Sequence, residues 1–352
     1  MSEKDLKSLK QRSTLIGVVF LSLFLCGLFL TPEISDLSNN TNNCRANTMN
    51  NDSSIDSAYV QEGELSSSLK IAVILVTFSD VAYTHEKEVI EDKFFAASNS
   101  LTDYYDEVSY SSLTITGDVT NWLPLSNTKS FYGNDSDNGI DDYHSARSQI
   151  VTDAFDAADL YVDFSAYDDF FIVHVGENQY LSGDQYDTWS HSYVPDDGLT
   201  WNYDGVTIDK VSIVAELEEF GIYCREFGRQ NNLPYLNDSH GVYNYVDDWA
   251  LMDSGAWNGN DGDSPAQLTG YSRKFFGFIN DSQIRVIEDE TILITNLSTI
   301  EQATEENLLI KLPLQDSKHY YLIEAREQTG YDTALPGQGV LIYKVDETKS
   351  SG

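Results

Sequence analysis

The sequence predicts an α/β (α+β) fold with a mixed sheet, followed by a β-rich C-terminal part. Three observations support this prediction. The chain has 352 residues, of which 41% are hydrophobic and 12% aromatic, and this is enough for a large core. Apolar or alternating runs are interspersed with segments of helical spacing as far as residue 284. From Arg285 onward only short alternating segments follow, a pattern typical of strands.

The main domain is predicted to span residues 69–284. Leu69–Phe78 reads LKIAVILVTF, a continuous apolar run that favours a strand buried on both faces. The remaining predicted elements of this domain, in chain order, are a strand at Ser112–Val119, a helix at Asp141–Leu160, strands at Phe170–Val175 and Val206–Val214, and a helix at Glu219–Gln230.

Residues 285–352 form the predicted β-rich C-terminal part. Alternation of apolar and polar residues indicates short strands there rather than helices. The predicted strands are Val286–Ile294, Leu308–Leu312, Tyr320–Glu324 and Gly339–Val345.

The first 34 residues read as a basic flank followed by an export segment. Four basic side chains within the first 12 residues precede an uncharged run from Ser13 to Pro32. This run is short for a spanning helix and long for the core of a signal peptide, so both a signal peptide and a retained signal anchor stay open. In either case the rest of the chain is exported. We therefore expect an extracellular or cell-surface protein, held at the membrane through residues 13–32 if the segment is uncleaved.

Residues 35–68 are rich in Asn and Ser, and we expect a disordered tether. The whole chain carries 57 acidic and 21 basic residues, a formal charge of −36. A charge so negative disfavours nucleic acid as a partner. Two segments rich in oxygen ligands, Asn134–Asp142 and Asn258–Asp263, make calcium a possible cofactor. Neither has the spacing of an EF-hand, and solvated loops are the alternative.

Residues 221–238 read GIYCREFGRQNNLPYLND, and they contain the frame of a zinc-protease helix. In the motif H-E-x-x-H, two histidines one turn apart bind a single ion. Here Arg225 and Arg229 stand in the histidine positions, and Glu226 between them is retained. A guanidinium group stays protonated and offers no lone pair, so neither arginine can act as a zinc ligand.

Several other segments resemble the immune inhibitor A family of secreted zinc metallopeptidases. They occur in the order of that family from about residue 69 to the end of the chain. The segments that carry the resemblance are Asp103–Val119 (DYYDEVSYSSLTITGDV), Phe131–Tyr143, Val162–Gln179, Asp187–Tyr193 (DTWSHSY), Trp249–Gly259 (WALMDSGAWNG) and Tyr320–Glu347. Members of the family usually continue beyond the last segment, so we expect the C-terminal part to be truncated.

The resemblance implies a zincin-like domain with a motif helix and a Met-turn. It assigns the general-base position to Glu226, the third ligand position to Tyr235 and the Met-turn residue to Met252. The turn position that is usually glycine falls on Asn232, and asparagine also tolerates the left-handed conformation that ends a helix. None of the three ligand positions holds a good zinc donor, so no zinc cofactor is expected although the family uses zinc.

Two functions remain open from the sequence. The first is an exported or membrane-anchored pseudoprotease that binds a peptide or protein. The second is an active zinc metalloendopeptidase with a non-standard metal site. Arg225 and Arg229 share one helix face, so the ligand of a pseudoprotease could be anionic. The alternative is that nearby carboxylates bind both arginines in a structural network.

Overall fold

The computed structural model describes residues 65–134, 146–195, 198–237, 244–288, 295–304, 306–314 and 318–348. All of them belong to one compact unit, Asp56–Gly352. The predicted export segment, the predicted tether up to residue 64 and residues 135–142 lie outside the described ranges. No helix within those ranges is long and apolar enough to cross a membrane.

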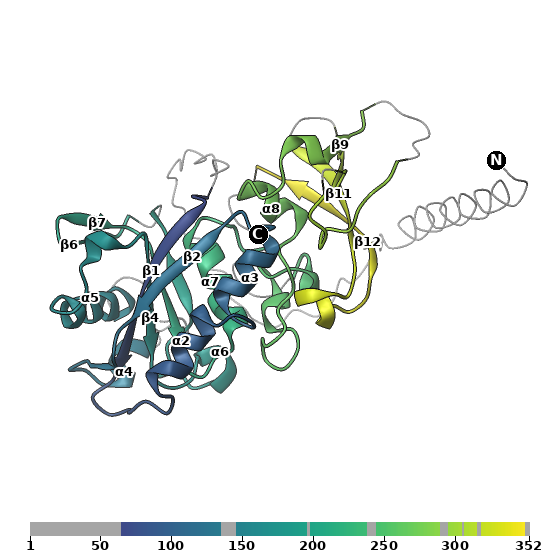
Figure 1. Ribbon diagram of the computed structural model, residues 1–352. Helices are drawn as coiled ribbons and strands as arrows, with labels where there is room; N and C mark the ends of the chain where they lie inside the picture. The colour runs from purple at the N-terminus through teal and green to yellow at the C-terminus, as the bar shows by residue number, and fades with distance from the viewer. Residues whose placement is uncertain are drawn as a thin grey trace, which may run out of the picture. The chain divides into compact units, whose positions relative to one another are not determined.

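A six-stranded mixed sheet forms the centre of the molecule (Figure 1). Its order is β2-β1-β4-β8-β5, with β3 beside the end of β1. Every pairing is parallel except that of β5, which runs antiparallel to β8 at one edge. The strands are β1 (Ser68–Thr77), β2 (Thr114–Val119), β3 (Leu123–Pro124), β4 (Asp169–His174), β5 (His191–Tyr193) and β8 (Val211–Ala215).

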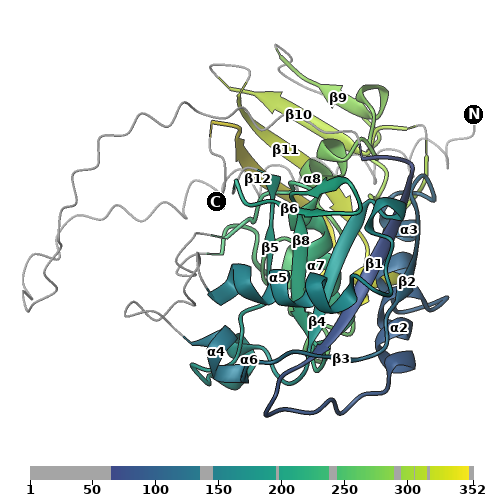
Figure 2. The same ribbon diagram turned by 90° about the vertical axis from the view of Figure 1, so that its left-hand side faces the viewer.

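Alternate side chains of β1 pack into two different cores, one on each face of the sheet. Ile71, Val73 and Leu75 belong to the core shared with helices α2 (Lys87–Phe95), α3 (Leu101–Val108) and α7 (Phe220–Gln230). Ala72, Ile74 and Val76 belong to the core under helix α5 (Ala146–Ala158). Figures 1 and 2 show α5 on one face of the sheet and the other three helices on the opposite face. The continuous apolar run of this strand is therefore explained by burial on both sides.

The predicted strand Val206–Val214 is wrong as a single element. Val206–Ile208 (β7) pairs with Trp201–Tyr203 (β6) as a separate hairpin, and only β8 joins the main sheet. The hairpin turns at Asp204 and Gly205, whose φ angles are 48° and 79°. An Asp-Gly pair adopts this left-handed geometry readily and is a common hairpin turn. Three shorter helices complete the main part: α4 (Lys129–Gly133), α6 (Gln179–Ser182) and α8 (Gly270–Phe275).

The C-terminal residues form a second sheet of four strands in the order β12-β11-β10-β9. Its strands are β9 (Ile284–Val286), β10 (Leu309–Pro313), β11 (His319–Arg326) and β12 (Gly339–Asp346). Three of the predicted strands are confirmed as β10, β11 and β12. The predicted strand Val286–Ile294 overlaps β9 only at Val286, and residues 289–294 lie outside the described ranges.

A buried ionic cluster joins this second sheet to the segment that follows α7. Arg326 on β11 is 1% exposed and pairs with Asp332 at 2.7 Å and Glu324 at 2.9 Å. Its guanidinium also donates to the carbonyl of Trp249 at 3.2 Å. Asp332 in turn accepts a hydrogen bond from the backbone N–H of Gln267 at 2.8 Å. The segment from residue 249 to residue 267, which contains Met252 and Trp257, is therefore anchored on the C-terminal sheet.

Candidate functional site

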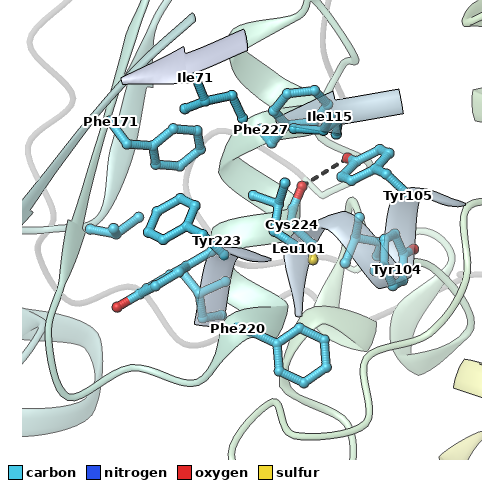
Figure 3. Packing of buried hydrophobic residues seen from close by; sticks show 14 of the residues in the cluster. Ile71, Leu101, Tyr104, Tyr105, Ile115, Phe171, Phe220, Tyr223, Cys224 and Phe227 are labelled. Atoms are coloured by element: carbon cyan, nitrogen blue, oxygen red, sulfur yellow. Dashed lines mark hydrogen bonds between the residues drawn. The ribbon is translucent and has the colours of Figure 1, made fainter. Parts of the chain in front are cut away.

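Helix α7 begins after Glu219 and is almost wholly buried. Figure 3 shows the face that packs into the core, with Phe220, Tyr223 and Phe227, and the hydroxyl of Tyr105 bonded to the carbonyl of Cys224 at 2.9 Å. Because this face of the helix packs into the core, only the residues on the opposite face of α7 can take part in a site.

Two glycines allow neighbouring segments to approach this helix closely. A Cβ atom at Gly228 would lie 2.9 Å from the sulfur of Met252 and 3.1 Å from the Tyr105 hydroxyl. A Cβ atom at Gly221 would lie 2.4 Å from the carbonyl oxygen of Ala256. Met252 is thus buried directly against the middle of α7, at the position expected of it, and its role as a Met-turn residue stays a prediction.

Glu226, the retained general-base position, is fully buried and bonded through both carboxylate oxygens. Its Oε1 accepts from the Arg225 guanidinium at 2.6 Å. Its Oε2 accepts from the Tyr235 hydroxyl at 2.9 Å and from the Ser192 hydroxyl at 2.8 Å. A buried carboxylate without such partners would be strongly unfavourable, so these three donors offset the cost of burying the Glu226 side chain.

Ser192 is a member of the site that the sequence did not reveal. It lies on β5, and its hydroxyl also bonds to the Glu226 carbonyl at 2.9 Å and to the Ser212 hydroxyl at 2.9 Å. Ser212 on β8 bonds further to Gln230 at 2.7 Å. These contacts attach α7 to the edge of the sheet. β5 has only three residues, which is too short for its alternation to be recognised.

The two arginines occupy different environments. Arg225 is 9% exposed, and its guanidinium carbon lies 4.2 Å from the centre of the Tyr235 ring and 5.1 Å from that of Trp257. Arg229 is partly exposed, and its guanidinium carbon lies 5.4 Å from the Tyr235 ring centre. Within the described part of the chain, Arg229 makes no ion pair. The structure therefore brings both arginines to the Tyr235 ring but joins only Arg225 to a carboxylate.

Tyr235 reaches the helix because the chain reverses at Asn232. The φ angle of Asn232 is 71°, so the predicted left-handed turn is confirmed. The backbone N–H of Leu233 bonds to the carbonyl of Gly228 at 2.9 Å and that of Asn232 to the carbonyl of Arg229 at 2.9 Å, which are the two bonds of a Schellman helix end. The position that the family resemblance assigns to the third ligand therefore does return to the helix face.

The side chains at the three presumed ligand positions do not suit zinc. Arg225 and Arg229 are cations without lone pairs. Burial, and next the charge of Glu226, raises the pKa of the Tyr235 phenol, so its hydroxyl keeps its proton and donates it to Glu226. Across the described ranges, no group of three or more His, Cys, Asp or Glu side chains could hold a metal ion. Calcium binding stays a prediction.

A second buried carboxylate, Glu218, binds the segments that lie next to α7 at its beginning. It accepts from Asn178, from the Ser190 hydroxyl at 2.5 Å and from the backbone N–H of Ala215 at 2.9 Å. Asn178 also caps α6, which carries Tyr180. Burial raises the pKa of Glu218 to about 7, against an ordinary value of 4.5, and its hydrogen bonds oppose the shift.

The comparison with known families identifies a metallopeptidase-like protein, and the structure has the mixed α and β elements of an α+β fold. The sequence matches the family model described as "Immune inhibitor A peptidase M6, catalytic domain" over residues 77–215 and 166–280, which together span more than half of the chain. The chain therefore belongs to the immune inhibitor A (M6) family, as its sequence blocks predicted.

One relative and one solved structure show how similar this chain is to known proteins. The chain is 24% identical over 269 residues to "Immune inhibitor A" of Bacillus thuringiensis subsp. alesti, a match covering 59% of this chain and 39% of the relative. The match thus spans about two fifths of that relative's length. Wild-type OgpA from Akkermansia muciniphila is 12% identical, with 85% of this chain and 89% of that chain covered, but the TM-score is only 0.33.

Proposed function

We propose that this chain is a catalytically inactive member of the family, exported or membrane-anchored, that acts by binding a peptide or protein. The observation that carries the proposal is the enclosure of Glu226 by Arg225, Tyr235 and Ser192. A general base must offer a lone pair to a water or substrate proton. The Glu226 side chain is fully buried, and three of the roughly four lone-pair sites of its carboxylate already accept hydrogen bonds from protein donors.

The surrounding frame supports the zincin-like part of the proposal. Helix α7, the left-handed turn at Asn232 and the burial of Met252 are consistent with the zincin motif helix and Met-turn that we propose, and they support that part of the proposal. The three presumed ligand positions hold Arg225, Arg229 and Tyr235 in place of the zinc donors that the family resemblance implies. A scaffold kept in this way, with its reactive groups replaced, suits recognition better than turnover. Export is supported by the uncharged run from Ser13 to Pro32 after a basic flank.

Family membership keeps the alternative of an active zinc metalloendopeptidase, and one experiment separates the two. Purified full-length chain would be assayed for bound zinc by elemental analysis and for hydrolysis of casein, beside Glu226→Gln. We expect no stoichiometric zinc and equal, background-level hydrolysis. Stoichiometric zinc that is lost in Arg229→Ala would overturn the proposal. So would a fall in turnover of about 10²–10⁴-fold in Glu226→Gln, the usual effect of removing an acid–base residue.

A further inference from the structure

Six side chains form a continuous series of tilted ring–ring and cation–π contacts that includes both arginines of α7. Each group contacts the next: Trp189 and Tyr180 with ring centres 6.1 Å apart, Tyr180 and Trp257 at 5.0 Å, Trp257 and Arg225 at 5.1 Å, Arg225 and Tyr235 at 4.2 Å, and Tyr235 and Arg229 at 5.4 Å. We call these six residues the stacked series. They come from α6, the segment before β5, the turn Ser254–Trp257, α7 and the loop after it. Cation–π and ring contacts of this kind hold flat groups in fixed planes.

The charge along the stacked series is uneven. Arg225 in its middle is compensated by Glu226 at 2.6 Å. Arg229 at one end is partly exposed and, in the ranges that the structure describes, has no carboxylate within ion-pair distance. The chain carries 57 acidic side chains, so an arginine that none of the described ones neutralises is unusual. Its guanidinium is held beside the Tyr235 ring and keeps its donors for a ligand.

The other end of the stacked series is apolar and open. Tyr180 is 57% exposed, and its neighbours Leu181 and Tyr186 are 40% and 41% exposed. Exposed aromatic side chains that are already ordered lose little conformational entropy when a ligand packs on them. This end offers aromatic and aliphatic contact area, and the nearby Asp184 is already paired with Lys129. The Arg229 end offers charge-assisted hydrogen bonds.

We propose that the stacked series is a binding site for a peptide carboxylate, with Arg229 as the anion-binding residue and Tyr180 and Trp257 as the apolar platform. This rests on the proposed function, because a site that binds a ligand without cleaving it needs no reactive group there. A guanidinium group can bind a carboxylate through two parallel N–H···O bonds, an arrangement that lysine cannot reproduce. The ligand is an apolar or aromatic peptide that carries one carboxylate, either at its C-terminus or on an acidic side chain.

Binding would be measured by calorimetry on the full-length chain with three N-acetylated peptides made of Phe and Gly. One has a free C-terminal carboxylate, one is its C-terminal amide, and one is the amide with a single internal Glu. We expect a carboxylate form to bind at least about tenfold more tightly than the plain amide, because a hydrogen bond to a charged group adds on the order of that factor. Whichever of the two carboxylate forms binds more tightly identifies the source of the anion.

Variants assign the effect to residues. Arg229→Ala should reduce the preference for carboxylate over amide to near onefold, and Arg229→Lys should restore it only partly. Tyr180→Ala should weaken both forms equally. Arg285→Ala, which removes an exposed arginine on β9, is the matched control and should change nothing. Thermal unfolding of each variant checks that it is folded.

Two outcomes would overturn the inference: equal affinity for the carboxylate and amide peptides, or an equal loss of preference in Arg285→Ala. Mass spectrometry of the peptides after incubation separates failure of the carboxylate site from failure of the proposed function. If the peptides stay intact and the carboxylate and amide forms bind equally well, the carboxylate site is rejected and the proposal that the protein is inactive is retained. Cleaved peptides reject inactivity itself, and with it the inference that depends on it.

Discussion

Arg225 and Glu226 are adjacent in sequence and depend on each other for burial. Arg225 is 9% exposed and Glu226 fully buried, with 2.6 Å between them. Removing one partner of a buried ion pair leaves the other charge uncompensated. We expect Arg225→Ala to lower the free energy of unfolding by about 3–5 kcal/mol, measured by urea denaturation.

Two further variants test the reason for that loss. Arg229→Ala removes the partly exposed arginine and should change stability by only about 0.5 kcal/mol. The double variant Arg225→Ala with Glu226→Gln should recover part of the lost stability, because no charge is then left buried. A double variant that is as unstable as the sum of the single ones would mean that packing, not charge, accounts for the loss.

Glu218 gives a prediction about pH. Its folded pKa of about 7 lies above its ordinary 4.5, so the folded state holds the proton more tightly than the unfolded state. The resulting stability is fully present below pH about 4.5 and is lost as the pH rises through about 7. The shift corresponds to an upper limit of about 3 kcal/mol.

The test compares Glu218→Gln with the unaltered chain by urea denaturation at several pH values between about 4.5 and 8. The variant should show a smaller fall in stability across this window, because the group that releases its proton is gone. Glu88→Gln, at an exposed position on α2, is the matched control and should follow the unaltered chain. Parallel curves for Glu218→Gln and the unaltered chain would contradict the assignment.

At the scale of elements, the turn after α7 and the packing of Met252 are the basis of a prediction about zinc. Asn232 has a φ angle of 71°, and Met252 packs against Gly228. We expect the triple variant Arg225→His, Arg229→His and Tyr235→Asp to bind zinc, since it places two imidazoles one turn apart and removes the phenol from Glu226. Elemental analysis and a chelator-reversible rise in the melting temperature would measure it.

The control for this prediction is the triple variant Arg225→Gln, Arg229→Gln and Tyr235→Asn. It removes the same charges and ring but supplies no comparable ligand set, so it should bind no zinc. A folded histidine variant that also binds none would show that the groups orienting the metal ligands have been lost together with the ligands.

Elements with a strong local signal could be predicted from the sequence. The apolar run of β1, the helix α7 and the turn at Asn232 are where the residues placed them. The strand β5 and Ser192 could not be predicted, because three alternating residues carry too little periodicity. The hairpin of β6 and β7 was missed because its Asp-Gly turn lies before an alternating run that continues into β8.

The sequence predicted that Arg225 and Arg229 share one face of α7, but it did not predict their contacts. Sequence spacing placed Arg225 and Arg229 on one helix face, and both do approach the Tyr235 ring. Which of them would pair with Glu226 depends on rotamers and on the loop that brings in Tyr235. Such contacts between distant segments have no local sequence signature, and neither does the position of Trp257 beside Arg225.

At the scale of the whole molecule, the cluster around Arg326 connects the C-terminal sheet to the segment between residues 249 and 267. Arg326→Ala would leave Glu324 and Asp332 buried without their shared cation, and both are 0% exposed. We expect a loss of about 3–5 kcal/mol in unfolding free energy. Hydrogen exchange should also increase between residues 249 and 267, because the bond from Arg326 to the Trp249 carbonyl is removed. Lys344→Ala, on the exposed side of β12, is the control and should leave exchange unchanged.

The net charge of −36 predicts that salt stabilises the folded chain. Exposed carboxylates repel one another more strongly in the compact state than in the unfolded state. Raising NaCl from about 0.1 M to about 1 M shortens the screening length from about 10 Å to about 3 Å, so the melting temperature should rise. The buried pair of Arg225 and Glu226 is shielded from the salt and should not offset this gain.

The same titration distinguishes general screening from a specific calcium site. Calcium chloride at millimolar concentration would be compared with NaCl at equal ionic strength. Equal melting temperatures are expected if calcium acts only as a counter-ion, because the described loop at Asn258–Asp263 bonds to itself: the backbone N–H of Asn260 donates to Asp263 at 2.8 Å. A larger rise with calcium that saturates would instead indicate a bound ion, since only a ligand with a defined affinity gives a saturable shift. Asp263→Asn would then show whether the ion lies in that loop.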